Sequence, residues 1–316
     1  MSTSGERAPG KGRVVVVGSA NVDLVVDVPR HPRGGETVLG GELRRTPGGK
    51  GANQAAGAAR AGGADTVLVA ALGRDDGAEL LLRSLGEAGV HTTGVRRVGA
   101  PTGTALITVS PDGENAIVVA PGANDHLSVD DGARELIATA DVVLAQLEIP
   151  LETVVAAAEA RRPGATFVLN AAPSRELPES LWRAVDVLVV NEHEAADLAG
   201  RQGGAPPDEP ADLARALLSR VPEVVVTLGG DGALVAGRGR RDVRVPGIAV
   251  DVVDTTAAGD TFCGVLAAEI AHGADLADAA RTAGVAGALA VTRAGAQEAV
   301  PDREEVLAAI RREEER

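Results

Sequence analysis

A regular alternation of short apolar runs and helix-forming stretches constrains the fold of this chain more than any other feature. Four runs rich in β-branched side chains occupy residues 142–145, 166–169, 187–190 and 224–228. Runs of this length and composition are typical of buried strands. Strands that alternate with helices predict a doubly wound α/β fold with a mostly parallel sheet flanked by helices. In such sheets ligands bind beyond the carboxyl ends of the strands.

Two pairs of more amphipathic strands interrupt this alternation. Residues 22–28 and 37–43 are predicted as half-exposed strands joined by a turn, and residues 103–109 and 115–119 as a hairpin. We interpret both pairs as a small β-sheet lid over the ligand-binding edge, contributed by residues 22–45 and 102–120. The other predicted elements are strands at 13–17 and 66–71 and helices at about 50–61, at 76–88 and after 258. Residues 13–316 are expected to form one α/β domain with this lid, and residues 1–12 a flexible tail.

Charge and composition restrict the kind of partner. The chain has 316 residues and a net charge of −14, which argues against nucleic acid or an anionic membrane as the main partner. One local pocket can still take an anionic substrate. Cys263 is the only cysteine, which excludes an intrachain disulfide and fits a reducing compartment. The start is polar and no apolar run reaches 18 residues, so we expect a soluble, cytoplasmic protein.

The segment Asp254-Thr-Thr-Ala-Ala-Gly-Asp260 is predicted to be a turn that opens a helix. Backbone N–H groups at a helix start lack partners and the helix dipole is positive there, so a phosphate is favoured. Asp260 lies in or near the first turn and, with an ordinary pKa of ~3.9, is expected to be a base at neutral pH. These are the parts that phosphoryl transfer needs. Taken alone, the pattern fits an aspartate that caps a helix equally well.

Five motifs occur in the order found in the PfkB/ribokinase family of carbohydrate kinases. Residues 254–260 resemble the C-terminal signature of the family, and Gly48-Gly-Lys-Gly-Ala-Asn53 resembles the N-terminal one. Between them lie Asn170-Ala-Ala-Pro173, Asn191-Glu-His-Glu194 and Thr227-Leu-Gly-Gly-Asp-Gly232. The resemblance covers residues 13–310 and is greatest to the ribokinases. It implies a ribokinase-like fold and ATP-dependent phosphorylation of D-ribose at its 5-hydroxyl.

The resemblance also implies a sugar site near the first strand. A carboxylate and an amide can bind a sugar diol through hydrogen bonds, and glycines allow close approach to a ligand. Alternatives remain open: an Asx turn or a plain turn, a surface amide, a solvated loop glutamate, and for Lys50 a solvated lysine, which is favoured over phosphate neutralisation. The residues implied in sugar binding are Asn21, Asp23, Gly49, Lys50, Gly51, Asn53, Glu148 and Asp260.

For the nucleotide end, the family pattern implies Asp260 as the catalytic base, with the backbone of Ala257, Ala258 and Gly259 as the anion hole. Residues implied in ATP binding are Asn191, Thr227, Gly229, Gly232, Gly259 and Gly284. Glu194 is implied in the Mg²⁺ shell through water, although Asn191 followed by Glu194 also fits a helix cap, and both can hold at once.

A K⁺ ion is the second implied metal. The matching positions for this monovalent cation are Asp254, Thr256, Ala290, Arg293 and Gly295, held mainly through carbonyl oxygens. Ala299 stands where the family often has serine, so one side-chain ligand is missing. Cys263 is interpreted as core packing and His193 as an exposed bystander.

Three hypotheses follow from the sequence. The first is a ribose kinase. The second is the same chemistry on another furanose or a nucleoside, such as deoxyribose, fructose or a ribonucleoside. The third is a non-catalytic sensor of sugar or nucleotide. The lid has almost no aromatic residues to stack on a base, which favours a bare pentose. Exposed strand edges in the lid predict a homodimer that pairs through it.

Overall fold

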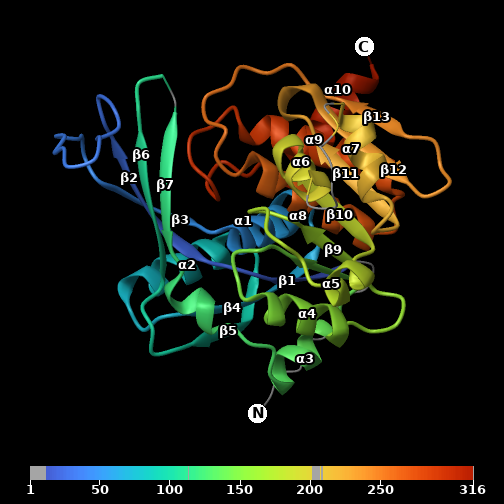
Figure 1. The fold of residues 1–316 in the computed structure, drawn as a ribbon, viewed down its shortest axis with the longest axis horizontal. Coiled ribbons are helices and arrows are strands. Elements are labelled where there is room, and N and C mark those ends of the chain that lie inside the picture. The colour runs from blue at the N-terminus through green and yellow to red at the C-terminus, as the bar shows by residue number, and fades with distance from the viewer. Residues whose placement is uncertain (1–11, 113, 201–206, 208, 316) are drawn as a thin grey trace.

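The computed structural model describes residues 12–112, 114–200, 207 and 209–315. A nine-stranded sheet forms the centre of the molecule (Figure 1). The strands from β11 to β5 are parallel, and β12 and β13 add an antiparallel edge. The order across the sheet is β13 (Val243–Pro246), β12 (Gly232–Gly237), β11 (Glu223–Thr227), β10 (Val187–Asn191), β9 (Thr166–Asn170), β8 (Val142–Ala145), β1 (Arg13–Val17), β4 (Asp65–Leu72) and β5 (His91–Arg97).

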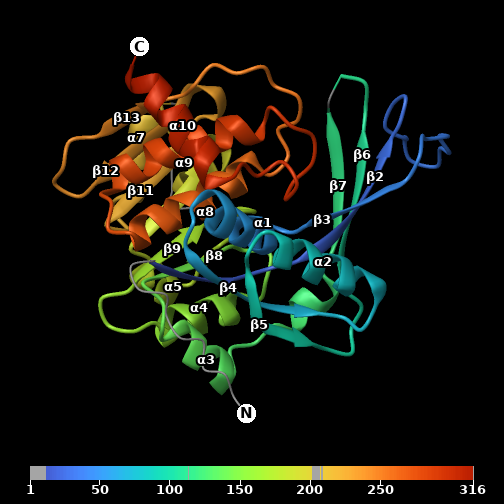
Figure 2. The ribbon, with the colours of Figure 1, turned by 180° about the vertical axis from the view of Figure 1, so that it is seen from behind.

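Two hydrophobic clusters lie on opposite faces of this sheet. Val14 and Val16 of β1 belong to one cluster and Val15 and Val17 to the other, as the alternation of side chains along a strand requires. The first face is covered by α1 (Lys50–Ala56), the π-helical turn η1 (Gly57–Ala61), α2 (Asp76–Glu87), α8 (Ala258–Ala271), α9 (Leu276–Ala290) and α10 (Arg303–Glu314), seen in front in Figure 2. The second carries α3 (Asp131–Ile137), α4 (Leu151–Ala160), α5 (Glu179–Ala184), α6 (Glu192–Gly200) and α7 (Pro210–Leu217).

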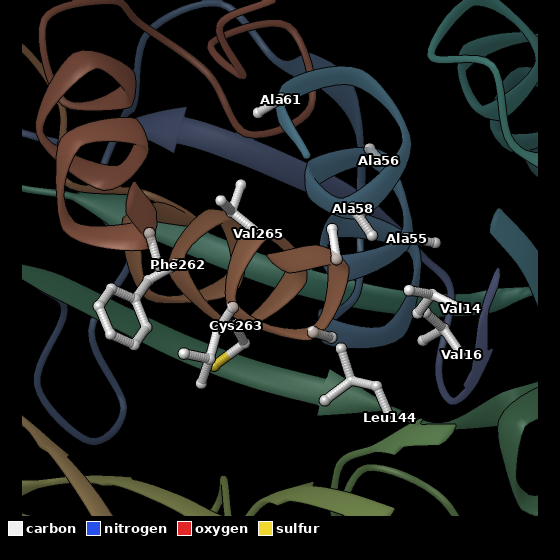
Figure 3. Close-up of a cluster of buried hydrophobic side chains, with 14 of the residues drawn as sticks. Val14, Val16, Ala55, Ala56, Ala58, Ala61, Leu144, Phe262, Cys263 and Val265 are labelled. Atoms are coloured by element: carbon white, nitrogen blue, oxygen red, sulfur yellow. The ribbon is translucent and has the colours of Figure 1, made fainter. Parts of the chain in front are cut away.

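Small side chains bring α8 close to α1 and η1. Figure 3 shows Ala55, Ala56 and Ala58 close to this helix, and Val265 and Cys263 projecting from it into the core. Cys263 is 2% exposed, and burial raises the pKa of its thiol well above the ordinary value. The interpretation of this cysteine as core packing is therefore confirmed.

A second sheet forms the predicted lid. Its four strands lie in the order β3 (Arg44–Gly48), β2 (Asn21–Asp27), β6 (Gly103–Val109) and β7 (Asn115–Ala120). In both views it stands beside the main body, next to α1 and α2 (Figures 1 and 2). The hairpin of β6 and β7 is confirmed, as are both predicted main-sheet strands at 13–17 and 66–71.

One lid strand was predicted in the wrong place. Residues 37–43 form no strand, and β2 pairs with β3 instead. The apparent alternation has no buried face, since Leu39 and Leu43 are 88% and 55% exposed, and Gly41 donates its N–H to the carbonyl of Asp27. Pro47 lies inside β3, which is tolerated because an edge strand can lack one donor.

The predicted N-terminal tail, residues 1–12, is too long by one residue. Residues 1–11 of the predicted tail lie outside the described residues, but Gly12 is buried, and a Cβ there would lie 2.3 Å from the carbonyl oxygen of Ala271. The tail can therefore reach only to residue 11. No helix in the described part of the chain is long and apolar enough to span a membrane.

Candidate active site

The site lies where the strand order reverses. The chain passes from β1 to β4 and β5 on one side and from β8 to β11 on the other, so β1 and β8 flank a topological switch point. Glu148, Glu194 and Gly229 of the predicted site follow β8, β10 and β11, at the edge where open α/β sheets bind ligands. The other predicted residues lie mainly on β2, on α1 and its glycine-rich start, on α8 and the segment before it, and on or just after α9.

Asp260 lies in the first turn of α8, as predicted. The helix starts at Ala258, and its N-cap, Ala257, has left-handed backbone torsions (φ 56°). For a residue other than glycine this conformation is strained by about 1–3 kcal/mol, and such strain is concentrated at functional sites. The Asp260 side chain is 8% exposed and accepts hydrogen bonds from two amides, from Asn53 Nδ2 at 3.1 Å and from Gln54 Nε2 at 3.0 Å.

Asn53 is therefore not a surface amide. It is 6% exposed and lies between Asp260 and the 292–302 loop, where its Oδ1 accepts from Gln297 Nε2 at 3.2 Å. Gln54 was not singled out from the sequence, although it belongs to the same glycine-rich motif as Asn53. Its position, four residues into a helix that faces α8, is the signal that could have found it.

Asn21 and Asp23 project from β2 on the same face, because they are two residues apart in a strand. Neither forms the Asx turn that was the alternative. Asn21 Oδ1 accepts a hydrogen bond from Asn124 Nδ2 at 2.7 Å, a partner that sequence reasoning missed. Burial, and then the charges of Glu148 and Asp260, raise the pKa of Asp23 to about 7. The absence of a side chain at Gly48 leaves room for the Asp23 carboxyl, since a Cβ there would lie 2.1 Å from Oδ2.

Glu148 is fixed by hydrogen bonds rather than solvated. Its Oε2 accepts from Ser19 Oγ at 2.6 Å and from the backbone N–H of Lys50 at 3.1 Å. The second contact places the carboxylate at the N-terminus of α1, where the helix dipole favours negative charge. Glu148 thus joins the loop after β8 to the glycine-rich start of α1.

Backbone conformation explains the glycine at position 49, and packing explains the glycine at position 51. Gly49 has a φ of +89°, which favours glycine. Gly51 packs against the loop after β1, and a Cβ there would lie 2.6 Å from the backbone of Gly18 and Ser19. The start of α1 therefore approaches the end of β1 closely, backbone against backbone.

The favoured interpretation of Lys50 as a freely solvated lysine was wrong. The side chain is only partly exposed, and the negative charge of Asp260 raises the pKa of its ammonium, with smaller contributions from Glu148 and Glu194. Lys50 therefore stays protonated and lies among carboxylates. A cation in this position can offset the charge of a phosphate.

Asn191 and Glu194 form the predicted helix cap at the start of α6. Asn191 Oδ1 accepts from the N–H of Glu194 at 2.8 Å, and Glu194 Oε2 accepts from the N–H of Asn191 at 2.9 Å. Burial raises the pKa of Glu194, partly offset by the hydrogen bond from Asn191 and by the charge of Lys50. The second carboxylate oxygen remains available to hold a water in a Mg²⁺ shell, so the residue fits the expected role. His193 is exposed, as predicted.

Four of the six predicted nucleotide residues, Asn191, Thr227, Gly229 and Gly232, lie at or just beyond the ends of two neighbouring strands. Asn191 of β10 pairs in register with Thr227 of β11. Beyond Thr227 the chain makes a single 3₁₀ turn, η3 (Gly229–Asp231), and Gly229 and Gly232 have φ values of +55° and +95°. Gly284 lies in α9 with open space where its side chain would be.

The two segments predicted to hold a monovalent cation lie side by side. Asp254 Oδ1 accepts from the N–H of Thr256 at 2.9 Å, and Oδ2 accepts from the N–H of Gly295 at 2.9 Å. Burial raises the pKa of Asp254, but hydrogen bonds from the Thr256 hydroxyl and then from these two N–H groups outweigh it and lower the pKa from its ordinary value. Arg293 N–H donates to the carbonyl of Ala290 at 3.2 Å. These contacts join the two segments predicted to hold the cation, and Ala299 is buried and supplies no side-chain ligand.

A cavity of about 650 Å³ separates the lid from these loops. Asp23 lies in it beside apolar lid residues and opposite the segment that precedes the anion hole. The lining includes Asp23, Val25, Arg44, Ile107, Ile117, Val252, Val253, Asp254 and Gly295. Asp23 is the one sugar-binding candidate among the lining residues, and it shares this hollow with residues 252–256, which lead into α8. No cluster of three or more metal-ligating His, Cys, Asp or Glu side chains occurs within the residues that the structure describes.

The chain belongs to the pfkB family of carbohydrate kinases, whose family model matches residues 11–303. Within that family it is similar to several ribokinases. A ribokinase from Haemophilus influenzae is 37% identical over 301 residues, which cover 93% of this chain and 97% of the relative. A bifunctional ribokinase/ribose-5-phosphate isomerase A from Fructilactobacillus sanfranciscensis is 38% identical over 311 residues, and the chain spans 57% of that longer protein.

The similarity extends to the fold. The structure of Arabidopsis thaliana ribokinase complexed with ribose and ATP superposes with a TM-score of 0.87 at 34% sequence identity, and covers 95% of this chain and 99% of the other. The expected family and the ribokinase-like α/β fold with a small second sheet are therefore confirmed.

Proposed function

We propose that this chain transfers the γ-phosphate of ATP to the 5-hydroxyl of D-ribose, giving ribose 5-phosphate and ADP. The observation that carries the proposal is the buried carboxylate of Asp260 in the first turn of α8, within electrostatic reach of Lys50 and Asp23. The similarity to ribokinases over nearly the whole chain supports the same reaction.

Asp260 would act as the base that accepts the proton of the 5-hydroxyl as the hydroxyl oxygen attacks the γ-phosphate. The transition state of phosphoryl transfer is loose and spreads charge over the phosphoryl oxygens, so positioning and electrostatics carry most of the catalysis. The backbone N–H groups of Ala257, Ala258 and Gly259 would bind that charge at the positive end of α8. Lys50, held in its charged form, would offset part of it.

The sugar would lie in the hollow beneath the lid. Asp23 and Asn21 offer hydrogen-bonding groups from β2, and Glu148 offers a carboxylate from the opposite side. The proposed sugar contacts are Asn21, Asp23, Gly49, Lys50, Gly51, Asn53, Glu148 and Asp260.

ATP would lie along the ends of β10 and β11, with its phosphates directed at α8. The residues proposed to contact it are Asn191, Thr227, Gly229, Gly232, Gly259 and Gly284. Mg²⁺ would be held through water near Glu194, and would supply positive charge to the phosphates. K⁺ would be held by Asp254, Thr256, Ala290, Arg293 and Gly295, and would support the conformation of the anion-hole loop.

Three further predictions accompany this function. Residues 13–316 would form one domain, with the lid contributed by 22–45 and 102–120. Two chains would associate through the lid, as its exposed strands suggest. A cytoplasmic location also stays a prediction.

The test is a coupled assay of ADP release over a panel of pentoses, hexoses and nucleosides, with Mg²⁺ and ATP, with and without K⁺. We expect ribose to give the highest kcat/KM. Asp260→Asn removes the base and should lower kcat by about 10²- to 10⁴-fold, the usual contribution of general base catalysis. Thermal unfolding of the variant is the control for folding.

Other outcomes would select another hypothesis. A higher kcat/KM with deoxyribose, fructose or a nucleoside would keep the mechanism and change the substrate. Binding of sugar or ATP by the wild type without any turnover would contradict the kinase and support a sensor.

A further inference from the structure

Two rows of buried amide side chains end on Asp260, and only one of their members, Asn53, is among the proposed substrate contacts. Gln54 is fully buried and Gln297 is 3% exposed, and the amide hydrogen bonds of both go to other side chains. Each lies on a separate route to the same carboxylate. The first row reaches Oδ1 of Asp260 and the second reaches Oδ2.

The first row has a fixed direction. Gln54 Nε2 donates to Asp260 Oδ1 and to Asn170 Oδ1, both at 3.0 Å. Because both partners are acceptors, the amide of Gln54 has one consistent orientation, with Oε1 facing away from the carboxylate. That oxygen accepts from Gln146 Nε2 at 2.6 Å. The N–H groups of the row therefore point from Gln146 through Gln54 to Asp260.

The hydrogen bonds of the second row also run toward Asp260. Ser84 Oγ on α2 donates to Gln297 Oε1 at 2.7 Å, and Gln297 Nε2 donates to Asn53 Oδ1 at 3.2 Å. Asn53 Nδ2 then donates to Asp260 Oδ2. Both rows converge on Asp260 as their final acceptor, and each bond in a row polarises the next.

We propose, on the basis of the function proposed above, that Gln54 and Gln297 are positioning residues for Asp260. They hold both carboxylate oxygens as hydrogen-bond acceptors, so that the ionised form is favoured and the remaining lone pairs are directed at the substrate hydroxyl. A proton on the remaining lone pair of either oxygen would make that oxygen a weaker acceptor for its amide N–H group. The two rows therefore donate hydrogen bonds to the ionised carboxylate, which is the form of Asp260 that can accept a proton.

Other titratable groups also face Asp260. Lys50 on α1, Asp23 on β2, Glu194 on α6 and Cys263 on α8 interact with it electrostatically. Glu148 faces Lys50 and Asp23 in turn. Substitution of Gln54 or Gln297 leaves these groups in place, so a change in pH dependence between variant and wild type reports on Asp260. Measuring kcat at saturating ribose keeps the titration of free Asp23 out of the comparison.

The experiment compares Gln54→Met and Gln297→Met with the wild type. Methionine keeps the length of the side chain and removes its donor. For Gln54→Met we expect kcat to fall at least tenfold, KM for ribose to change less than threefold, and the acidic limb of kcat to move about one pH unit upward, as expected for a lost hydrogen bond to a charged group. Gln297→Met acts through Asn53 and should shift the limb in the same direction by less.

Thr153→Val is the matched control, since it removes a buried hydrogen bond of 2.6 Å to the carbonyl of Leu127 and touches neither row. It should lower the unfolding temperature and leave the acidic limb unchanged. Folded Gln54→Met with wild-type kcat and an unmoved limb would overturn the proposal. Should Gln54→Met fail to fold, an unmoved limb in Gln297→Met overturns it and a shifted one supports it. Loss of the proposed function is a separate result, recognised by a wild type that phosphorylates no sugar.

Discussion

Asp23 shows how a single buried carboxyl in the proposed sugar site can oppose stability. Its pKa of about 7 means that ionisation costs free energy in the folded protein, because burial removes water from the carboxylate and because Glu148 and Asp260 repel it. Unfolded, the same group titrates near 3.9. The folded state therefore binds the proton more tightly than the unfolded state, and the contribution of Asp23 to stability falls as pH rises from about 4 to about 7.

Asp23→Asn is expected to stabilise the unliganded protein at high pH. At pH 8 the wild type carries the full cost of the buried charge, on the order of 2–4 kcal/mol for a shift of this size. The variant has no such cost, so its advantage should be largest near pH 8 and should fade toward pH 4. Denaturant unfolding of both proteins across this range measures the difference. A variant that is equally destabilised at every pH would contradict the prediction.

At the scale of single residues, the sequence pointed to the right region but not to the contacts. The motifs located Asp260, Asn53 and Glu148 near one sheet edge, and the structure places them there. Gln54 and Asn124 were missed because a buried amide and an exposed one look alike in a sequence. Which of them is buried depends on how closely α1 and α8 approach.

At the scale of elements, that close approach rests on Gly264 in α8. A Cβ at this position would lie 2.2 Å from the carbonyl oxygen of Gln54 and 2.7 Å from the backbone nitrogen of Ala58. Both contacts are with backbone, so neither can move aside cheaply. The helix that carries Asn53 and Gln54 can therefore meet α8 only because residue 264 has no side chain.

Gly264→Ala should push α1 away from α8. We expect a loss of about 1–3 kcal/mol in the free energy of unfolding, the usual cost of overpacking a core. The kcat for ribose should also fall, because both amides on Asp260 come from α1. Gly86→Ala is the control: it lies in α2 with open space around its Cβ position, and should stabilise by about 0.5–1 kcal/mol as an alanine in a helix does. Equal effects of the two substitutions would refute the packing argument.

Most elements of the main sheet could be predicted because they are buried on both faces and read as apolar runs. The edges could not. β5 has the sequence His-Thr-Thr-Gly-Val-Arg-Arg and is only partly covered, so no apolar run marks it. β13, the edge strand at the other end of the sheet, was also missed and is mostly exposed, whereas β12 was missed although it is a buried apolar run between β11 and β13. An edge strand owes its place to one neighbour, and that neighbour is not visible in the local sequence.

At the scale of the whole molecule, the lid has two faces with different roles. Asp23, Val25 and Ile107 share the face that lines the cavity. Leu106 and Val118 are paired across β6 and β7 on the other face and are 51% and 64% exposed. β7 is also a free edge of the small sheet. An exposed apolar strand at a sheet edge favours association with another chain.

Leu106→Glu should therefore separate the proposed dimer. A charge placed in the centre of an apolar interface should weaken association by about 2–4 kcal/mol, or on the order of 10²- to 10³-fold in Kd. Sedimentation equilibrium should give a mass of two chains for the wild type and of one chain for the variant at the same micromolar concentration. Leu307→Glu makes the same substitution on α10, where the side chain is 37% exposed, and should leave the mass of two chains unchanged. A wild type with the mass of one chain at every concentration would rule out the lid dimer, and separation by both variants would place the interface elsewhere.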